Sequence, residues 1–180
     1  SLVPSPYGGS SYNYLYSVAA LASNDVWAVG MYQNSGSGRQ TLVEHWNGTA
    51  WSIAASPDPS PDNVLYGVDV ISSTDVWVIG SDANNNNLYQ TLIEHWNGTA
   101  WSVVASPDPG SANNILSGVS AASSSDVWAV GYYNNTNSAY FTLTEHWNGM
   151  AWSAVSSPSP GSSNNLYGVA AVSSNDVWAV

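Results

Sequence analysis

Short runs of apolar and aromatic residues, each ended by turn-forming residues, recur along the whole chain. In the first unit they lie at Leu15–Leu21, Asp25–Tyr32, Gln40–Trp46 and Ala50–Ala55. Val, Trp, Tyr, Thr and Leu dominate the runs, and Asn, Ser, Gly and Pro fill the breaks. This arrangement predicts β-strands joined by turns. No stretch shows the apolar spacing of an amphipathic helix, so the pattern predicts an all-β fold.

The four predicted strands form a unit that repeats. The sequence DVWAVG begins at Asp25, returns almost unchanged from Asp75 and Asp126, and closes the chain as DVWAV from Asp176. Equivalent Asp residues are therefore 50 or 51 residues apart. A second motif, EHWNGTAWS or a close variant, occurs once in each complete unit.

A four-stranded unit of about 50 residues has the size of a propeller blade, whereas coils of β-solenoids are usually shorter. The second strand is apolar on both faces, and radially stacked blades would cover both. We predict propeller-type blades of four antiparallel strands, with about 3.6 repeats present. The expected division is the end of a preceding blade at 1–13, blades at 14–63, 64–113 and 114–164, and the first half of a further blade at 165–180.

An Asn-Gly pair joins the third and fourth predicted strands of each unit. A two-residue type I′ loop at Asn47 and Gly48 would pair Trp46 with Thr49, whereas a four-residue loop would pair Trp46 with Trp51. Both alternatives place the two indoles on one face. These side chains are candidates either for the core or for a platform that stacks on sugar rings: Trp46, Trp51, Trp96, Trp101, Trp147 and Trp152.

The combination of DVWAVG with EHWNGTAWS resembles the tandem β-propeller repeats of secreted bacterial proteins over nearly the whole chain. It is similar, more loosely, to Kelch and tectonin-type blades, in which a W-x-G-x-x-W hairpin recurs. The resemblance implies a propeller fold and a binding or scaffold role, and it names no ligand. Trp27 stands where the Asp-box of sialidase-type propellers has Gly, and the Kelch double glycine is absent. These departures argue against inferring an enzyme.

Charge and composition exclude several classes of function. Arg39 is the sole basic side chain and the formal net charge is −11, so the chain repels phosphate backbones and anionic lipid surfaces. We therefore expect neither nucleic acid as a partner nor insertion into a membrane. The absence of Cys removes thiol catalysis and zinc–thiolate sites. A chain without Lys and rich in Asn, Ser and Trp favours an extracellular or cell-surface location.

The repeated ionisable residues predict no catalytic residue, no metal site and no cofactor. Each His stands in Glu-His-Trp on a different unit, too far from the others to share a metal, and is expected to be structural: His45, His95 and His146. The Glu before each His is expected on the Trp face, where an indole or backbone N–H would satisfy its carboxylate. Each Asp of DVW is expected to form an Asx turn rather than to bind calcium.

Catalysis would need residues that break the repeat. Asp69 does so, because it replaces Ala or Ser in the first strand, which usually lines the channel of a propeller. No His, Ser or second carboxylate breaks the pattern beside it, so we expect a solvated polar side chain. The acidic, proline-rich segment Ser56–Asp62 is expected to be a surface loop, with weak calcium binding as the alternative.

Three sequons make Asn47, Asn97 and Asn134 candidates for glycan attachment. The first two lie at the predicted hairpin tips. The third hairpin keeps Asn148 and Gly149 but has Met150 in place of Thr, which favours turn geometry as the main reason for Asn-Gly.

Two functions remain open. The first is a non-catalytic extracellular scaffold with a structural or assembly role, in a surface layer, a fibre or adhesion. We expect its partner to be a second copy, or a continuation of its own chain, that supplies the missing strand after Asp176–Val180. The alternative is a lectin-like module that binds carbohydrate. Exposed indoles would favour the second and buried indoles the first.

Overall fold

The computed structural model describes residues 3–84, 86–136 and 139–180, and it confirms the all-β prediction. Within these ranges the strands form three antiparallel sheets of four strands and one sheet of two, each in the order of the chain. Among the described residues, no helix has the length and apolar character needed to cross a bilayer.

The strand bounds repeat from sheet to sheet. The first sheet contains β1 (Tyr12–Ala22), β2 (Asp25–Gln33), β3 (Arg39–Trp46) and β4 (Trp51–Ile53). The second contains β5 (Asp62–Ser72), β6 (Asp75–Ala83), β7 (Tyr89–Trp96) and β8 (Trp101–Val103). The third contains β9 (Asn114–Ser123), β10 (Asp126–Asn134), β11 (Tyr140–Trp147) and β12 (Trp152–Ala154). The last contains β13 (Val169–Ser173) and β14 (Asp176–Ala179).

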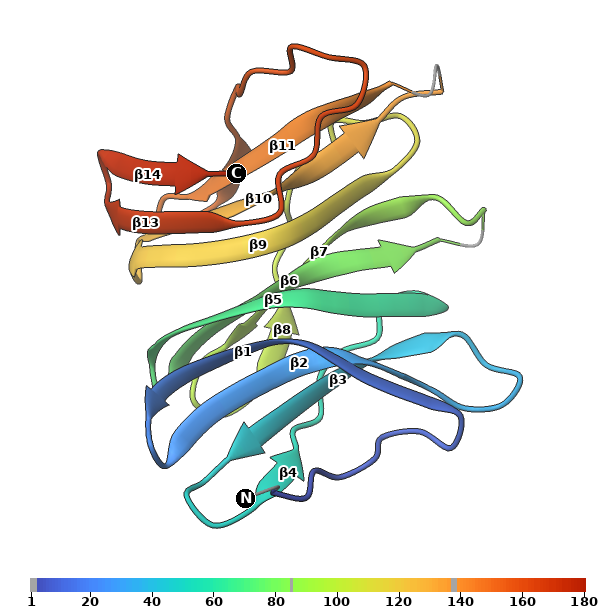
Figure 1. Cartoon of the computed structure of the whole chain (residues 1–180), viewed down its shortest axis with the longest axis vertical. Helices are drawn as coiled ribbons and strands as arrows, with labels where there is room; N and C mark the ends of the chain where they lie inside the picture. Colours follow the sequence, from blue (N-terminus) through green and yellow to red (C-terminus); the bar gives the residue numbers. More distant parts are fainter. Residues whose placement is uncertain (1–2, 85, 137–138) are drawn as a thin grey trace.

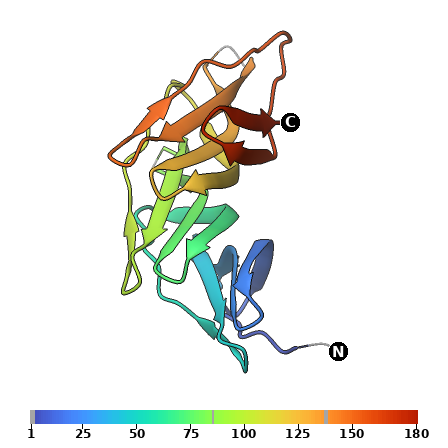
Figure 2. The same ribbon diagram turned by 90° about the vertical axis from the view of Figure 1, so that its left-hand side faces the viewer.

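The sheets are stacked face to face like blades. Their first strands β1, β5, β9 and β13 run side by side in that order (Figure 1). Figure 2 shows the sheets fanned into an open arc, with these first strands on its concave side and the short fourth strands on its convex side. The described sheets do not close into a ring. The concave surface is therefore open to solvent.

The core lies between neighbouring sheets rather than within one. One cluster joins Trp27, Val29 and Val43 of the first sheet to residues of the second that include Leu92 and Trp101. An equivalent cluster joins the second sheet to the third. The apolar second strands are thus covered on both faces, as β6 shows by its burial from Val76 to Ala83. On β14 the equivalent Trp178 is 70% exposed.

The Asn-Gly hairpins adopt the four-residue loop. Trp46 pairs with Trp51, and Asn47 Oδ1 accepts hydrogen bonds from the backbone N–H groups of Thr49 (2.9 Å) and Ala50 (3.0 Å). Gly48 has a φ of +90°, whereas Asn47 does not have a positive φ. The two-residue type I′ alternative, which requires positive φ at both residues, is therefore wrong.

Candidate functional site

The repeated tryptophans form contacts between sheets. The ring of Trp27 lies 5.5 Å from Trp96 and 5.4 Å from Trp101, both on the next sheet. Trp77 repeats this arrangement with Trp147 at 5.1 Å and Trp152 at 5.5 Å. Each Trp pair on the second and third sheets is therefore in contact with an indole of the preceding sheet. Their rings pack against the neighbouring sheet and do not present an open platform.

The six candidate tryptophans differ in burial. Trp101 and Trp152 are each 6% exposed, whereas Trp46, Trp51, Trp96 and Trp147 are half-buried. Trp46 and Trp51 lie against each other, with their rings 5.8 Å apart, on the side of the first sheet that faces away from the second. Each Trp at the end of a third strand also donates its indole N–H to a backbone carbonyl, as Trp46 does to Ser23 at 3.1 Å. These contacts favour a structural role for the indoles.

Each Asp of DVW binds side chains. Asp25 Oδ1 lies 2.8 Å from His45 Nε2 and accepts a hydrogen bond from Trp27 Nε1 at 3.1 Å. The rings of Trp27 and His45 stack at 4.2 Å. The Asp–His contact is also 2.8 Å long in the second and third sheets. The Asx-turn interpretation is therefore replaced by an Asp–His pair that connects the second and third strands of each complete unit. The Trp of DVW also donates to the Asp in the first and third sheets, whereas Trp77 Nε1 has no hydrogen-bond partner among the described residues.

The repeated glutamates lie in the packed interior. Glu94 and Glu145 are fully buried, and both oxygens of each lack a hydrogen-bond partner among the described residues. The expected bond from an indole N–H is not formed: Trp96 Nε1 donates to the carbonyl of Ser73, and Trp101 Nε1 has no hydrogen-bond partner among the described residues. Burial is the main cause that raises the pKa of Glu94 to about 9 and that of Glu145 to about 8. Glu44 differs, since Ser5 Oγ lies 2.7 Å and 2.9 Å from its two oxygens.

Asp69 connects two neighbouring sheets. Its Oδ2 accepts a hydrogen bond of 2.7 Å from the backbone N–H of Ala121 on β9. Ser120, the equivalent residue of the next unit, accepts one of 3.0 Å from Ala171 on β13. The expectation of a merely solvated side chain is therefore wrong. An Asp or Ser side chain at this position accepts a hydrogen bond from a backbone N–H group on the first strand of the following sheet.

The acidic linker is also held by hydrogen bonds. Asp58 Oδ1 accepts from the backbone N–H of Thr41 at 2.7 Å, and Asp108 does the same for Thr91 at 2.8 Å. Asp62 forms an ion pair with Arg39, which also donates to the hydroxyl of Tyr89 at 3.0 Å. Within the described residues, no group of three or more His, Asp or Glu side chains is placed to hold a metal ion.

The three sequon residues have different surroundings. Asn47 and Asn97 lie exposed at hairpin tips, where their side chains close the loops. Asn134 is only 8% exposed at the end of β10, and its Oδ1 accepts from the backbone N–H of Asn113 at 2.8 Å. Glycan attachment at all three remains a prediction.

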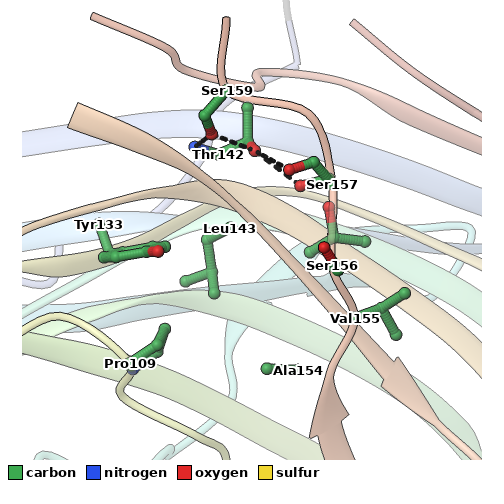
Figure 3. Close-up of a pocket in the computed structure, with 10 residues that line it drawn as sticks. Pro109, Tyr133, Thr142, Leu143, Ala154, Val155, Ser156, Ser157 and Ser159 are labelled. Atoms are coloured by element: carbon green, nitrogen blue, oxygen red, sulfur yellow. Dashed lines mark hydrogen bonds between the residues drawn. The ribbon is translucent and has the colours of Figure 1, made fainter. Parts of the chain in front are cut away.

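A small pocket of about 170 Å³ lies on the third sheet beside the linker residue Pro109 (Figure 3). Its polar rim consists of hydroxyl groups that bind one another. Thr142 Oγ1 lies 2.6 Å from Ser157 Oγ, and Ser159 Oγ accepts from the backbone N–H of Thr142 at 3.0 Å. Ser159 thus does for β11 what Asp58 does for β3. These bonds fix the linker, and we regard the pocket as structural.

An exposed surface of tyrosines lies on the first strands, on the concave side of the arc. Tyr12, Tyr14 and Tyr16 follow one another on β1, with ring centroids 6.1 Å and 6.2 Å apart, and each is about half exposed. Tyr16 lies 5.6 Å from Tyr66 of the next sheet. We call these four residues the tyrosine row. Tyr16 and Tyr66 occupy equivalent shifts in the strand register, between Leu15 and Ser17 and between Leu65 and Gly67.

The tyrosine row was not predicted from the sequence, in which the six tryptophans of the hairpins form the more regular aromatic pattern. A signal was available in the repeat. Leu-Tyr recurs in the first predicted strand, with its tyrosines at Tyr16, Tyr66 and Tyr167.

Comparison with known proteins supports a propeller-type fold. No family model matches the chain, and no curated protein matches it. Among solved structures, a fucose lectin from Kordia zhangzhouensis in complex with methyl-fucoside has a TM-score of 0.54 and 12% identity, covering 79% of this chain and 99% of the lectin chain. A structure titled YCF48 bound to D1 peptide has a TM-score of 0.51 and 14% identity, covering 78% of this chain. This chain spans only 39% of the latter protein's chain.

Proposed function

We propose that this chain is a non-catalytic, extracellular or cell-surface module that binds carbohydrate through its tyrosine row. The observation that carries the proposal is the stack of Tyr12, Tyr14 and Tyr16, which are 52%, 47% and 49% exposed. Folding does not bury these rings, and contiguous exposed aromatic surface commonly marks a binding site. Tyrosine combines a flat apolar ring with a hydroxyl group, which suits the apolar faces and hydroxyls of a sugar.

The negative charge of the chain favours a neutral sugar over a nucleic acid as the ligand. Aromatic rows also stack on the bases of single-stranded nucleic acids, but such sites add a positively charged groove for the phosphates. This chain has a single Arg, no Lys and a formal net charge of −11, so it has no such groove. A polymer of neutral sugars fits both the rings and the charge. The lectin similarity adds support at the level of the fold.

Retention on immobilised neutral polysaccharides tests the proposal. We expect the chain to be retained and to be eluted by soluble polysaccharide. Replacement of Tyr14 and Tyr16 by Ser should weaken retention severalfold, because it removes two of the rings proposed to contact the sugar. The variant should remain folded, since both rings are about half exposed and contribute little to the core. Tyr7→Ser is the matched control, since Tyr7 is 83% exposed and lies outside the row. Absence of retention on every neutral polysaccharide would overturn the proposal.

A second candidate is assembly through completion of the last sheet. A groove of about 270 Å³ lies between the third sheet and the β13–β14 pair, and Trp128, Val130 and Val177 are among its lining residues. At the equivalent places of the preceding sheets, Trp27 and Trp77 are covered by a Trp pair from the next hairpin. A Trp-bearing hairpin from a second copy, or from a further stretch of polypeptide, would fill this groove and pair with β14.

The native mass tests assembly by a second copy. We expect particles heavier than the 19.0 kDa of the chain that dissociate when Trp128 is replaced by Ala. A monodisperse particle of 19.0 kDa that is unchanged over a wide range of concentration would contradict it.

A further inference from the structure

We propose that the hollow beside Ser117 is a subsite for a single neutral pyranose ring. This inference rests on the carbohydrate-binding function proposed above and assigns it a place and a ligand class. The subsite consists of Tyr66, Ile115, Ser117, Tyr132 and Tyr167, which line a cavity of about 340 Å³. It lies at the continuation of the tyrosine row across the third sheet.

The repeat explains why the hollow exists. Equivalent positions of the first strands carry Tyr16, Tyr66 and Tyr167, but the third unit carries Ser117. Where two tyrosines succeed each other, as Tyr16 and Tyr66 do, their rings lie 5.6 Å apart. The small side chain of Ser117 leaves the place of one aromatic ring open between Tyr66 and Tyr167.

A second departure from the repeat occurs in the same cavity. Tyr132 stands where the other complete units have Met31 and Ser81. One substitution therefore removes a ring from the middle of the row, and the other adds a ring at the side of the resulting space. Tyr132 is held by an edge contact with Tyr140, at 5.6 Å and an angle of 67°. The hollow is therefore lined by three tyrosines together with Ile115 and Ser117.

The lining of the hollow fits a neutral sugar. The lining contains no carboxyl, amine, guanidine or imidazole group, so it is uncharged at neutral pH. Burial raises the pKa of Tyr66 and Tyr132 further above the usual value for a phenol. Their hydroxyl groups remain neutral hydrogen-bond donors and acceptors. The volume stands at the low end of the range for small-ligand pockets, which suits one ring rather than an extended ligand.

A neighbouring hollow of about 310 Å³ extends the site along the first strands. Its lining includes Gly67, Gly118 and Gly168, so part of its wall is backbone without side chains. It also contains Tyr16 and Tyr66 and therefore joins the Ser117 hollow to the tyrosine row. A sugar polymer lying along the row can place one residue in the hollow while its neighbours contact the exposed rings.

The decisive variant is Ser117→Tyr, which restores the residue found in the other units and should leave the fold intact. Methyl glycosides of fucose, galactose, glucose and mannose serve as probes, with binding followed by saturation-transfer NMR and calorimetry. We expect saturable binding of at least one glycoside to the unaltered chain and at least tenfold weaker binding to Ser117→Tyr. Tyr132→Met should also weaken binding, whereas Tyr7→Ser should not.

Each contrary result has a distinct meaning. Equal binding of a glycoside to the unaltered chain and to a folded Ser117→Tyr variant would overturn the subsite and leave carbohydrate binding in place. Tighter binding of a methyl glucuronide than of the neutral glycosides would overturn the ligand class. Absence of binding by every glycoside would overturn the subsite, and polysaccharide retention would then decide the proposed function separately.

Discussion

Trp27 and Trp101 meet edge to face across the boundary between the first and second sheets, with ring centroids 5.4 Å apart and an angle of 80° between the rings. The two residues are far apart in sequence and belong to different repeat units. Trp77 and Trp152 repeat the arrangement at 5.5 Å and 78°. The first sheet is thus joined to the second, and the second to the third, by the same aromatic contact, and the strength of this contact can be measured.

Replacement of Trp27 by Ala should destabilise the chain by about 3–5 kcal/mol, the usual cost of removing a large aromatic side chain from a core. Trp27 is 3% exposed and contacts Trp96 and Trp101 of the next sheet. Trp178→Ala is the matched control, because the same residue type in the same motif is 70% exposed there. Urea unfolding followed by circular dichroism gives both values. A similar loss for the two variants would show that the contact between sheets does not determine stability.

Asp69→Ala should cost about 1.5–3 kcal/mol, the range for hydrogen bonds that involve a charged group. The carboxylate accepts from the backbone N–H of Ala121, which the substitution leaves without this partner. Asp69→Ser should recover much of the loss, since Ser120 makes the equivalent bond in the next unit. Hydrogen exchange at Ala121 provides the direct measurement. Protection of this amide that is unchanged in Asp69→Ala would contradict the proposed role.

Gly48→Ala should be more destabilising than Gly36→Ala. Both glycines have positive φ, +90° and +79°, so Ala incurs a backbone cost of about 1 kcal/mol at either position. At Gly48 an added Cβ would also lie 2.7 Å from Asn24 Cβ, whereas at Gly36 it meets nothing within 4 Å. Thermal unfolding of the two variants measures the difference. Equal losses would mean that the hairpin tip can shift to relieve the clash.

The sequence was sufficient for the strands and their order, because strand formation and hairpin connection depend on local pattern. The length of the hairpin loop was not decided by that pattern. Asn-Gly is compatible with a two-residue and with a four-residue hairpin loop. The structure adopts the four-residue loop, in which Asn47 Oδ1 accepts hydrogen bonds from the backbone N–H groups of Thr49 and Ala50. The partner of Trp27 could not be found locally either, since it lies on the next unit.

The candidate site could not be predicted from local sequence pattern either. The exposure of Tyr14 and Tyr16 depends on how the first strands line the concave side of the arc, and on a register shift between Leu15 and Ser17. Alternation along a strand does not reveal such a shift. The Ser117 hollow needs both the repeat and the structure, because the missing ring matters only where the neighbouring rings of Tyr66 and Tyr167 are in place.

The stability of the chain should fall as the pH rises from about 4.5 to about 9, and Glu94 should be a main cause. Burial raises its pKa from the ordinary 4.5 to about 9, so in this range the folded chain holds a proton that the unfolded chain has released. Stability decreases with pH wherever the folded state binds more protons. The contribution of Glu94 is therefore fully present below pH 4.5 and is lost as the pH passes through 9.

Glu94→Gln removes this dependence, because the amide stays neutral throughout. We expect a flatter profile of unfolding free energy against pH, with the variant gaining on the unaltered chain toward pH 9. Glu145→Gln should act similarly up to about pH 8. Glu44→Gln is the informative comparison. Burial raises the pKa of Glu44 as well, but the hydrogen bond from Ser5 opposes this effect because it favours the ionised form. Urea unfolding at intervals from pH 5 to 9 measures the three profiles. If Glu94→Gln leaves the slope unchanged, the carboxyl group of Glu94 is ionised in the folded chain and must have a partner or solvent at neutral pH.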